Sequence, residues 1–303
     1  MEKKGIVFGE GFLGKRISSE LNFFLPKFRV IAGNEESWKD LEIMLDREKF
    51  DVVVNAVGKT DYDFCENNRI VAENSNVGIP LNLARQCSKR GIYFVHIGTG
   101  NVYGYCGGRS YTEEDEPNFF NDVYTETKIT AERKLKELSE EDQNSKILQI
   151  RIAYPFDYTT SSKNLLTKIL NHKKALSLRH SVTVVPDMID ALGKLIEKKS
   201  VGIYNVVNKG TISAFDIMLM YNNVVDKRKV VAKKLEFETI SLYKFEMSSS
   251  RKRSLCILNT KKLMNEGIEM PYVYDSVESC LIKYFENLQN STKFQINQGS
   301  EFK

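Results

Sequence analysis

The sequence predicts an α/β protein in which a doubly wound parallel sheet is joined to a smaller, helix-rich lobe. Short, continuously apolar runs alternate with amphipathic stretches through the first half of the chain. A glycine-rich turn directly follows the first apolar run. With 303 residues, 42% of them hydrophobic, the chain is long enough for one large domain or two closely packed ones.

The apolar runs have the composition of strands that are buried on both faces, which is typical of parallel sheets. They cover residues 5–9, 29–33, 51–58, 93–98 and 147–154. Helical patterns separate them at 12–24, at 37–46, twice within 62–90, and at 123–139. Strands and helices that alternate at this interval form βαβ units, so we expect a parallel sheet with helices on both faces.

After about residue 155 the alternation gives way to a helix-rich pattern. Helical stretches begin near residues 164 and 186, a buried strand is expected at 202–208, and a helix precedes the terminal tail. We therefore predict a first domain and a second lobe that interleave along the chain. The first comprises 1–156, which residues 181–209 rejoin. The second comprises 157–180 and 210–290, and 291–303 form a tail.

Charge and cysteine content exclude several functional classes. The 44 basic and 40 acidic residues are scattered rather than gathered in a stripe, so nucleic-acid binding is not expected. The five cysteines include no C-x-x-C pair and the three histidines lie apart from them, which argues against a disulfide framework or a metal site. No apolar stretch approaches the ~20 residues of a membrane span. We expect a cytoplasmic protein that does not bind membranes.

The first candidate site is the turn "GEGFLG", in which Gly9, Gly11 and Gly14 form G-x-G-x-x-G between a strand and a helix. Such a turn lets helix N–H groups hold a pyrophosphate, as in Rossmann dinucleotide-binding domains, although glycines also serve plain tight turns. A carboxylate at the end of the second strand would favour NAD. The sequence has Asn34 there, with acids only at 35–36, so NADP(H) is favoured.

The second candidate site is the pair Tyr124 and Lys128, which stand four positions apart at the start of a helical pattern and share one face. A cation beside a phenol lowers the phenol pKa from ~10 and makes it a usable proton donor. Such a pair alone is often only a solvated helix face. Thr99 strengthens the functional interpretation, because it ends the 93–98 run at the sheet edge where ligands of such folds bind.

These residues resemble the extended short-chain dehydrogenase/reductases, since Thr99 stands four positions before Tyr103 of "NVYG" and precedes Y-x-x-x-K. The resemblance implies that Thr99 hydrogen-bonds the substrate carbonyl, that Tyr124 transfers the proton, and that Lys128 orients the nicotinamide ribose. It also implies a cofactor-side loop at "NAVG" and a supporting helix asparagine at Asn76. The implied cofactor contacts are Gly9, Gly11, Phe12, Leu13, Gly14, Asn34, Asn55, Ala56, Val57, Tyr124, Lys128 and Tyr154.

A closer resemblance is to the plant-type UDP-4-keto-6-deoxyglucose 3,5-epimerase/4-reductases and the related dTDP-4-dehydrorhamnose reductases. It rests on segments 113–128, 151–155, 164–169, 181–189, 202–213 and 258–263. It implies NADPH-dependent reduction of a UDP-linked 4-keto-6-deoxy sugar by a homodimer. A related acetamido sugar nucleotide as substrate, or a non-catalytic NADP-binding sensor, are the alternatives.

The same resemblance supplies candidate substrate residues. Asn164, Val185 and Arg253 match positions that bind the sugar, base or diphosphate, with Arg251 an equal alternative to Arg253. Epimerisation in that family needs a cysteine and a lysine. Lys168 matches the lysine, but Asn101, which cannot ionise, stands at the cysteine position. Cys106 is either a substitute or a loop thiol without a role, so epimerase activity is in doubt.

Overall fold

A computed structural model describes residues 3–26, 34–105, 107–228, 234–247 and 252–299. The chain divides into two compact units that are described separately. The first comprises 1–153, 188–207 and 251–270, and the second comprises 154–187, 208–250 and 271–303. Among the described residues, no helix combines the length and apolar character that crossing a bilayer requires.

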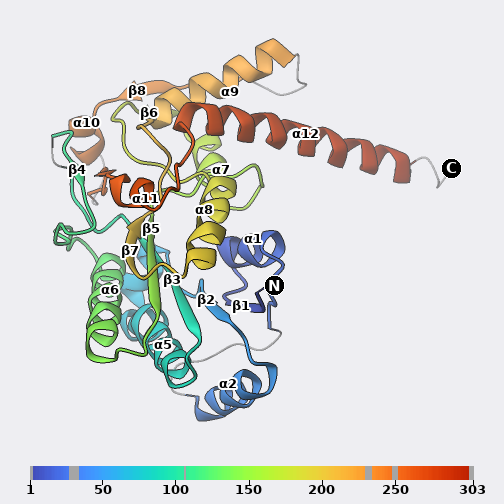
Figure 1. The fold of residues 1–303 in the computed structure, drawn as a ribbon. Helices are drawn as coiled ribbons and strands as arrows, with labels where there is room; N and C mark the ends of the chain where they lie inside the picture. The colour runs from blue at the N-terminus through green and yellow to red at the C-terminus, as the bar shows by residue number, and fades with distance from the viewer. Residues whose placement is uncertain (1–2, 27–33, 106, 229–233, 248–251, 300–303) are drawn as a thin grey trace. The chain divides into compact units, whose positions relative to one another are not determined.

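The first unit is built on a five-stranded sheet in which neighbouring strands pair in parallel (Figure 1). Its strands, in order across the sheet, are β1 (Gly5–Phe8), β2 (Val52–Asn55), β3 (Tyr93–Thr99), β5 (Ile147–Ile152) and β7 (Gly202–Asn205). The doubly wound fold class is confirmed. The expected strand at 29–33 lies outside the described residues.

Four helices of the first unit pack against this sheet, namely α1 (Phe12–Glu20), α2 (Glu35–Glu48), α5 (Ile79–Lys89) and α6 (Val123–Glu141). Three shorter elements, α3 (Tyr62–Asn67), α4 (Arg69–Glu73) and the π-helix η1 (Asn74–Gly78), contact α6 instead. The helix expected at 12–24 ends early because Asn22 adopts a left-handed conformation, after which Phe24 forms a bridge beside Ile6 of β1. The bounds of the other helices in this unit differ by a few residues between the sequence prediction and the structure.

One face of the sheet changes from apolar to polar along its strands. Ile6, Val53, Phe94 and Ile147 are register partners and form one buried cluster with residues of α2, α5 and α6. Two residues further along, the same face carries Asn55, His96 and Gln149, which are also register partners. All three are buried. Polar side chains therefore lie under α6 at the carboxyl end of the strands, where ligands of such folds bind.

Residues 251–270 group with the first unit rather than with the lobe to which the sequence assigned them. The physical reason is a second, two-stranded parallel sheet, in which β9 (Ile257–Leu258) pairs with β4 (Ser110–Tyr111). The backbone N–H of Asn259 extends this pairing by donating to Tyr111 O. The short helix α11 (Lys261–Asn265) follows β9, while α8 (Val185–Lys198) begins in the second unit and continues in the first.

The second unit is mostly helical. It contains α7 (Leu165–Leu170), α9 (Ala214–Arg228), α10 (Leu242–Met247), α12 (Val273–Gly299) and a two-stranded sheet of β6 (Lys174–Leu176) and β8 (Glu238–Ile240). Its core joins side chains of α7, α9 and α12. The expectation of a tail from residue 291 is wrong as far as Gly299, because α12 continues to that residue. Residues 300–303 lie outside the described residues.

Candidate active site

The β1–α1 turn is so closely packed that two of its glycines cannot carry a side chain. A Cβ on Gly14 would lie 1.7 Å from Gly9 O, because helix and strand approach closely there. Gly9 has φ +119°, and its Cβ would lie 2.6 Å from the backbone of Ala56. A Cβ on Gly11 would meet no atom within 4 Å. The turn is therefore tight on its inner side and open beside the helix.

The open side of the turn has the chemistry of a phosphate site. Gly11 is the N-cap of α1 and offers no side-chain cap, and the first turn holds no acidic residue. The first N–H groups of α1, at Phe12 and Leu13, therefore have no capping side chain and lie at the positive end of the helix dipole. This arrangement fits the pyrophosphate of a dinucleotide.

The side chain of Asn55, the last residue of β2, fixes the loop that follows this strand. Its Oδ1 accepts the N–H of Val57 at 3.1 Å, and its Nδ2 lies 2.9 Å from His96 Nδ1. The side chain is completely buried, so the expectation that Asn55 touches the cofactor through that side chain is wrong. Its partners give it a different role, which is to fix the loop that brings the Ala56 backbone against Gly9.

The expected cofactor residue Asn34 also has a structural role. Its Oδ1 caps α2 by accepting the N–H of Ser37 at 3.0 Å, and the residue is exposed. The strand that would lead into it lies outside the described residues. Any discrimination between NAD and NADP by Asn34 therefore remains a prediction.

Asn76 ties the loop after β2 to the helix that carries the catalytic candidates. Its Oδ1 accepts the N–H of Lys59 at 2.7 Å, while its Nδ2 donates to Lys59 O at 3.0 Å and to Thr127 Oγ1 at 2.9 Å. Asn76 lies in η1, and π-helical turns are frequent at functional sites. The loop and α6 are thus held in one arrangement.

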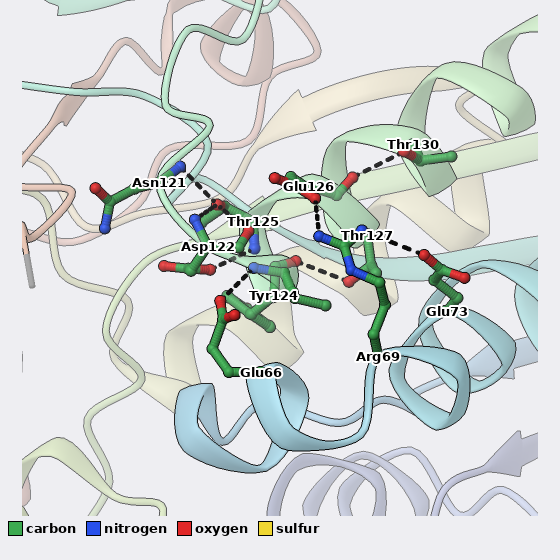
Figure 2. Close-up of polar contacts among 11 residues, drawn as sticks. Glu66, Arg69, Glu73, Asn121, Asp122, Tyr124, Thr125, Glu126, Thr127 and Thr130 are labelled. Carbon is green, nitrogen blue, oxygen red and sulfur yellow. Dashed lines mark hydrogen bonds and ion pairs between the residues drawn. The ribbon is translucent and has the colours of Figure 1, made fainter.

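Several side chains fix the first turns of α6 (Figure 2). Asp122 and Thr125 form a capping box, in which Asp122 Oδ1 accepts the Thr125 N–H at 2.8 Å. Glu66 on α3 accepts the N–H of Val123 at 2.8 Å. Arg69 on α4 forms an ion pair with Glu126 at 2.8 Å. These contacts fix the backbone on both sides of Tyr124, and they therefore determine where its phenol lies.

Thr99 and Tyr124 meet in a buried position. They are 6% and 7% exposed, and the Thr99 hydroxyl lies near the Tyr124 phenol. Burial raises the pKa of Tyr124 above its ordinary value, and the neighbouring Thr99 hydroxyl only partly opposes this. The Tyr62 ring packs edge-on against Tyr124, with centroids 5.1 Å apart. The phenol is therefore a protonated group in a largely dry environment.

Lys128 lies one helical turn after Tyr124 and is also buried. Its Nζ is 3.3 Å from His96 Nε2 and 3.2 Å from Ile97 O. Burial lowers the pKa of Lys128 to about 8, although Glu132 opposes the shift. The prediction that Lys128 brings the Tyr124 phenol toward neutrality is wrong for this structure, because burial outweighs the lowering influences and the lysine Nζ contacts β3.

His96 is a site residue that the sequence analysis missed. In the apolar run "YFVHIG" it has no local signal, since a histidine in such a run is usually a satisfied core residue. Only the register of β3 with β2 reveals its contacts with Lys128 and Asn55. The buried pair of Glu132 and Arg151 was also missed, and it is joined by hydrogen bonds of 2.8 and 2.7 Å.

Asn101 lies beside Thr99 in the first unit. Its backbone N–H donates to Thr99 Oγ1 at 3.1 Å, which orients that hydroxyl. Its buried side-chain Oδ1 has no hydrogen-bond partner among the residues that the structure describes. An acceptor without a partner next to Thr99 suits a ligand hydroxyl. Cys106 lies outside the described residues.

Two of the expected substrate residues have structural roles in the second unit. The Asn164 side chain is completely buried, and its Oδ1 accepts the N–H groups of Asp157 and Leu166. Its Nδ2 donates to the carbonyls of Asp157 and Thr159 at 2.6 Å each. All four hydrogen-bonding positions of the amide are used, so the prediction that this side chain binds substrate is wrong.

Val185 is likewise a core residue. Its side chain is 0% exposed and its N–H donates to Phe156 O at 2.9 Å, so neither the side chain nor the N–H is available to substrate. Lys168 on α7 is exposed, and Tyr154 packs against His180 with a left-handed backbone. These residues belong to the second unit, whereas Thr99, Tyr124 and Lys128 belong to the first.

Arg253 is exposed and belongs to the first unit, in the segment before β9. The neighbouring Ser254 is buried, and its hydroxyl donates to Tyr103 O at 2.6 Å, which anchors this segment to the "NVYG" turn. The alternative, Arg251, lies outside the described residues. Among the described residues, no three His, Cys, Asp or Glu side chains are grouped so as to hold a metal ion.

The sequence family described as the RmlD substrate-binding domain matches residues 10–285. The chain belongs to this family. A bifunctional dTDP-4-dehydrorhamnose 3,5-epimerase/dTDP-4-dehydrorhamnose reductase of Arabidopsis thaliana is 30% identical over 183 residues, which are 57% of this chain and 59% of that protein. The match thus spans little more than half of that relative. The family resemblance seen in the sequence is confirmed.

Solved structures confirm the fold. The UDP-rhamnose synthase of Acanthamoeba polyphaga mimivirus superimposes with a TM-score of 0.80 at 24% identity, covering 93% of this chain and 100% of that one. The dTDP-4-dehydrorhamnose reductase of Bacillus anthracis, crystallised with NADP, gives a TM-score of 0.76 at 19% identity over 93% of this chain and 99% of that one. The relatives are nucleotide-sugar reductases and epimerases.

The glycine turn generates a stability prediction. Gly14→Ala should lower the melting temperature by roughly 4 °C or more, because its methyl group would overlap Gly9 O. Gly11→Ala is the matched control, and its melting temperature should stay within about 2 °C, since Gly11 has φ −76° and open space beside it. Differential scanning calorimetry measures both. Equal melting temperatures for the two variants would contradict the close approach described here.

Proposed function

We propose that this chain is an NADPH-dependent reductase of the 4-keto group of a UDP-linked 4-keto-6-deoxy hexose. The observation that carries the proposal is the buried pair of Thr99 and Tyr124, whose hydroxyl groups adjoin at the carboxyl edge of the sheet. This edge also holds the phosphate-binding turn of α1. Family membership supports the substrate class, and UDP rather than another nucleotide rests on the relatives alone.

When bound, NADPH supplies the hydride that reduces C4. Thr99 donates a hydrogen bond to the keto oxygen, and Tyr124 gives its proton to the same oxygen as negative charge develops there. The raised pKa of Tyr124 suits this direction of transfer, because the phenol stays protonated until a more basic oxygen arrives. In this proposal Lys128, one turn along α6, holds the nicotinamide ribose.

The choice of NADPH is supported by relatives and by the chain itself. The reductase of Bacillus anthracis was crystallised with NADP, and a neighbour from Pseudomonas aeruginosa was crystallised with NADPH. In this chain an amide, Asn34, stands where a carboxylate would favour NAD. Because Gly11→Ala is expected to leave the fold intact, it can also test the site: its methyl group would enter the space beside α1 and should weaken NADPH binding.

Tyr124→Phe tests the assignment of the proton donor. The variant should bind NADPH as the parent does but reduce UDP-4-keto-6-deoxyglucose ~10²-fold or more slowly, because a positioned general acid is lost. The rate is followed as loss of nicotinamide absorbance. Tyr62→Phe is the matched control, since it removes a hydroxyl from the adjoining ring and should retain most activity.

Two outcomes would count against the proposal in different ways. Near-normal turnover by Tyr124→Phe would remove Tyr124 from the mechanism. Tight NADPH binding without oxidation by any 4-keto nucleotide sugar, acetamido sugars included, would instead favour a cofactor-binding sensor.

We also propose that the 3,5-epimerase activity of this chain is impaired. Epimerisation at C3 and C5 requires groups that remove a proton and return it on the opposite face. Asn101 cannot ionise, and Lys168 is exposed on α7. Reduction alone therefore follows from the groups assembled around Thr99.

A reaction in deuterated water separates the two activities. With UDP-4-keto-6-deoxyglucose and NADPH, we expect the product to lack solvent deuterium at C3, at C5 or at both, as measured by mass spectrometry. Asn101→Cys is the informative variant, because it restores an ionisable thiol beside Thr99 and should increase the exchange. Full exchange at both carbons by the unaltered chain would show that epimerisation does not need the thiol.

A homodimer is part of the same proposal. Ile70 and Val71 of α4 expose 74% and 44% of their surface, and Phe120, just before α6, exposes 54%. The ion pair of Arg69 with Glu126 shows that α4 and α6 adjoin, so these apolar side chains lie on neighbouring elements. We expect a dimeric mass by light scattering at micromolar concentration, and a monomeric mass for Ile70→Glu. A monomer in both cases would contradict the proposal.

A further inference from the structure

A buried chain of hydrogen bonds leads from the loop after β2 to Lys128. Asn55, His96 and Lys128 are 0%, 1% and 7% exposed, and they come from β2, β3 and α6. Asn55 Nδ2 lies 2.9 Å from His96 Nδ1, and His96 Nε2 lies 3.3 Å from Lys128 Nζ. The chain is anchored at its far end by the Val57 N–H, 3.1 Å from Asn55 Oδ1.

The anchor determines the direction of the hydrogen bonds. A backbone N–H can only donate, so the Asn55 atom that faces Val57 must be the carbonyl oxygen. The amide nitrogen then faces His96, and it too can only donate. His96 Nδ1 must therefore accept, which in a neutral imidazole places the proton on Nε2. Burial and the neighbouring Lys128 hold the pKa of His96 well below its ordinary value, so the ring is neutral.

The Nε2–H group of His96 consequently points at Lys128 Nζ. An uncharged amine can accept this hydrogen bond, whereas an ammonium has only donors and would oppose it. From these contacts we propose that Asn55 and His96 are positioning residues that lock one imidazole tautomer and so favour the uncharged amine of Lys128. The inference deepens the proposed function, because it concerns the protonation state of the lysine that is placed to hold the cofactor ribose.

None of the other described groups around Lys128 is a free carboxylate that would stabilise its ammonium form. Glu132 on α6 favours the ammonium, but both its oxygens are engaged by Arg151 of β5. Ile97 O accepts from Lys128 in either protonation state. Gln149, the register partner of His96 on β5, is uncharged, and burial keeps Tyr124 protonated.

The side chains that η1 and α6 bring near this helix turn, Asn76 and Thr127, are also uncharged. Burial lowers the pKa of Lys128 to about 8, and Glu132 opposes this shift. A group with a lowered pKa loses its positive charge as the pH rises through that value. Lys128 is thus cationic below pH 8 and increasingly an amine above it.

The tautomer of His96 can be measured directly, without substrate or NADPH. The chain has three histidines, so ¹⁵N-histidine labelling gives a simple long-range ¹H–¹⁵N spectrum, and His96→Phe assigns the signal. We expect the Nε2–H tautomer in the unaltered protein. An Nδ1–H tautomer would overturn the inference. The tautomer itself is read from the unaltered protein, and the variant serves only to assign the signal.

Asn55→Asp should move the proton of the His96 imidazole from Nε2 to Nδ1. One carboxylate oxygen still accepts the Val57 N–H, but the other now accepts from His96 Nδ1–H, which leaves a lone pair on Nε2 for the Lys128 ammonium. The spectrum should change to the Nδ1–H tautomer, and the titration of Lys128, followed by ¹³Cε NMR and assigned with Lys128→Arg, should move upward by about one pH unit or more.

His96→Phe is the matched variant without added charge. It keeps a buried ring but removes the Nε2–H donor, so the Lys128 titration should again move upward. An unchanged Lys128 titration in both variants would overturn the inference even if the enzyme is active. Conversely, the expected tautomer and shifts in a protein that reduces no 4-keto sugar would leave the inference standing and overturn only the proposed function. In an active protein, the alkaline limb of the kcat/KM profile should move with the Lys128 titration.

Discussion

The register of the parallel sheet is the constraint on which the candidate site depends. Ile6, Val53, Phe94 and Ile147 align across four strands and bury one face against helices. The same alignment puts the next inward-facing residues, among them Asn55 and His96, side by side under α6. A slip of one residue in β3 would turn Phe94 and His96 to the opposite face together. Apolar packing at one end of the strands therefore fixes the polar contacts at the other.

The helix that covers this polar region is positioned mainly at its first turn. The capping box of Asp122 satisfies the backbone locally, and Glu66 and Arg69 attach the same turn to α3 and α4. Asn76 attaches the next turn to the loop after β2. Other residues of α6 therefore fix the position of the helix. The side chains of Tyr124 and Lys128 are not needed to attach it.

Local patterns in the sequence were sufficient for the fold and for part of the site. The apolar runs give the strands, the three glycines give the turn, and the four-residue spacing puts Tyr124 and Lys128 on one helix face. These features depend on neighbours within a few positions, so a sequence can reveal them. Thr99 needed only one further inference, namely that the carboxyl ends of parallel strands meet at one edge.

What the sequence could not reveal depends on partners far along the chain. Asn164 is a plausible ligand by residue type, yet its four hydrogen bonds to backbone groups become visible only when the loop around Asp157 is folded. Val185 was matched by position in a family motif, but burial of its side chain is a tertiary fact. The protonation state of Tyr124 was misjudged for the same reason, since burial, unlike spacing, is not a local property.

The density of buried ionisable groups under α6 is itself an argument about function. Lys128, Glu132, Arg151 and His96 are each at most 8% exposed. Burying such groups costs stability unless their partners are well placed, and an apolar core of the same volume would often be at least as stable. The Glu132–Arg151 pair is fully engaged and adds little that an apolar pair could not supply. Lys128 differs, because its remaining contacts are with His96 and a backbone carbonyl, and neither neutralises its charge. Packing alone does not account for a lysine kept there, whereas the proposed role of a titratable amine one helical turn from Tyr124 does.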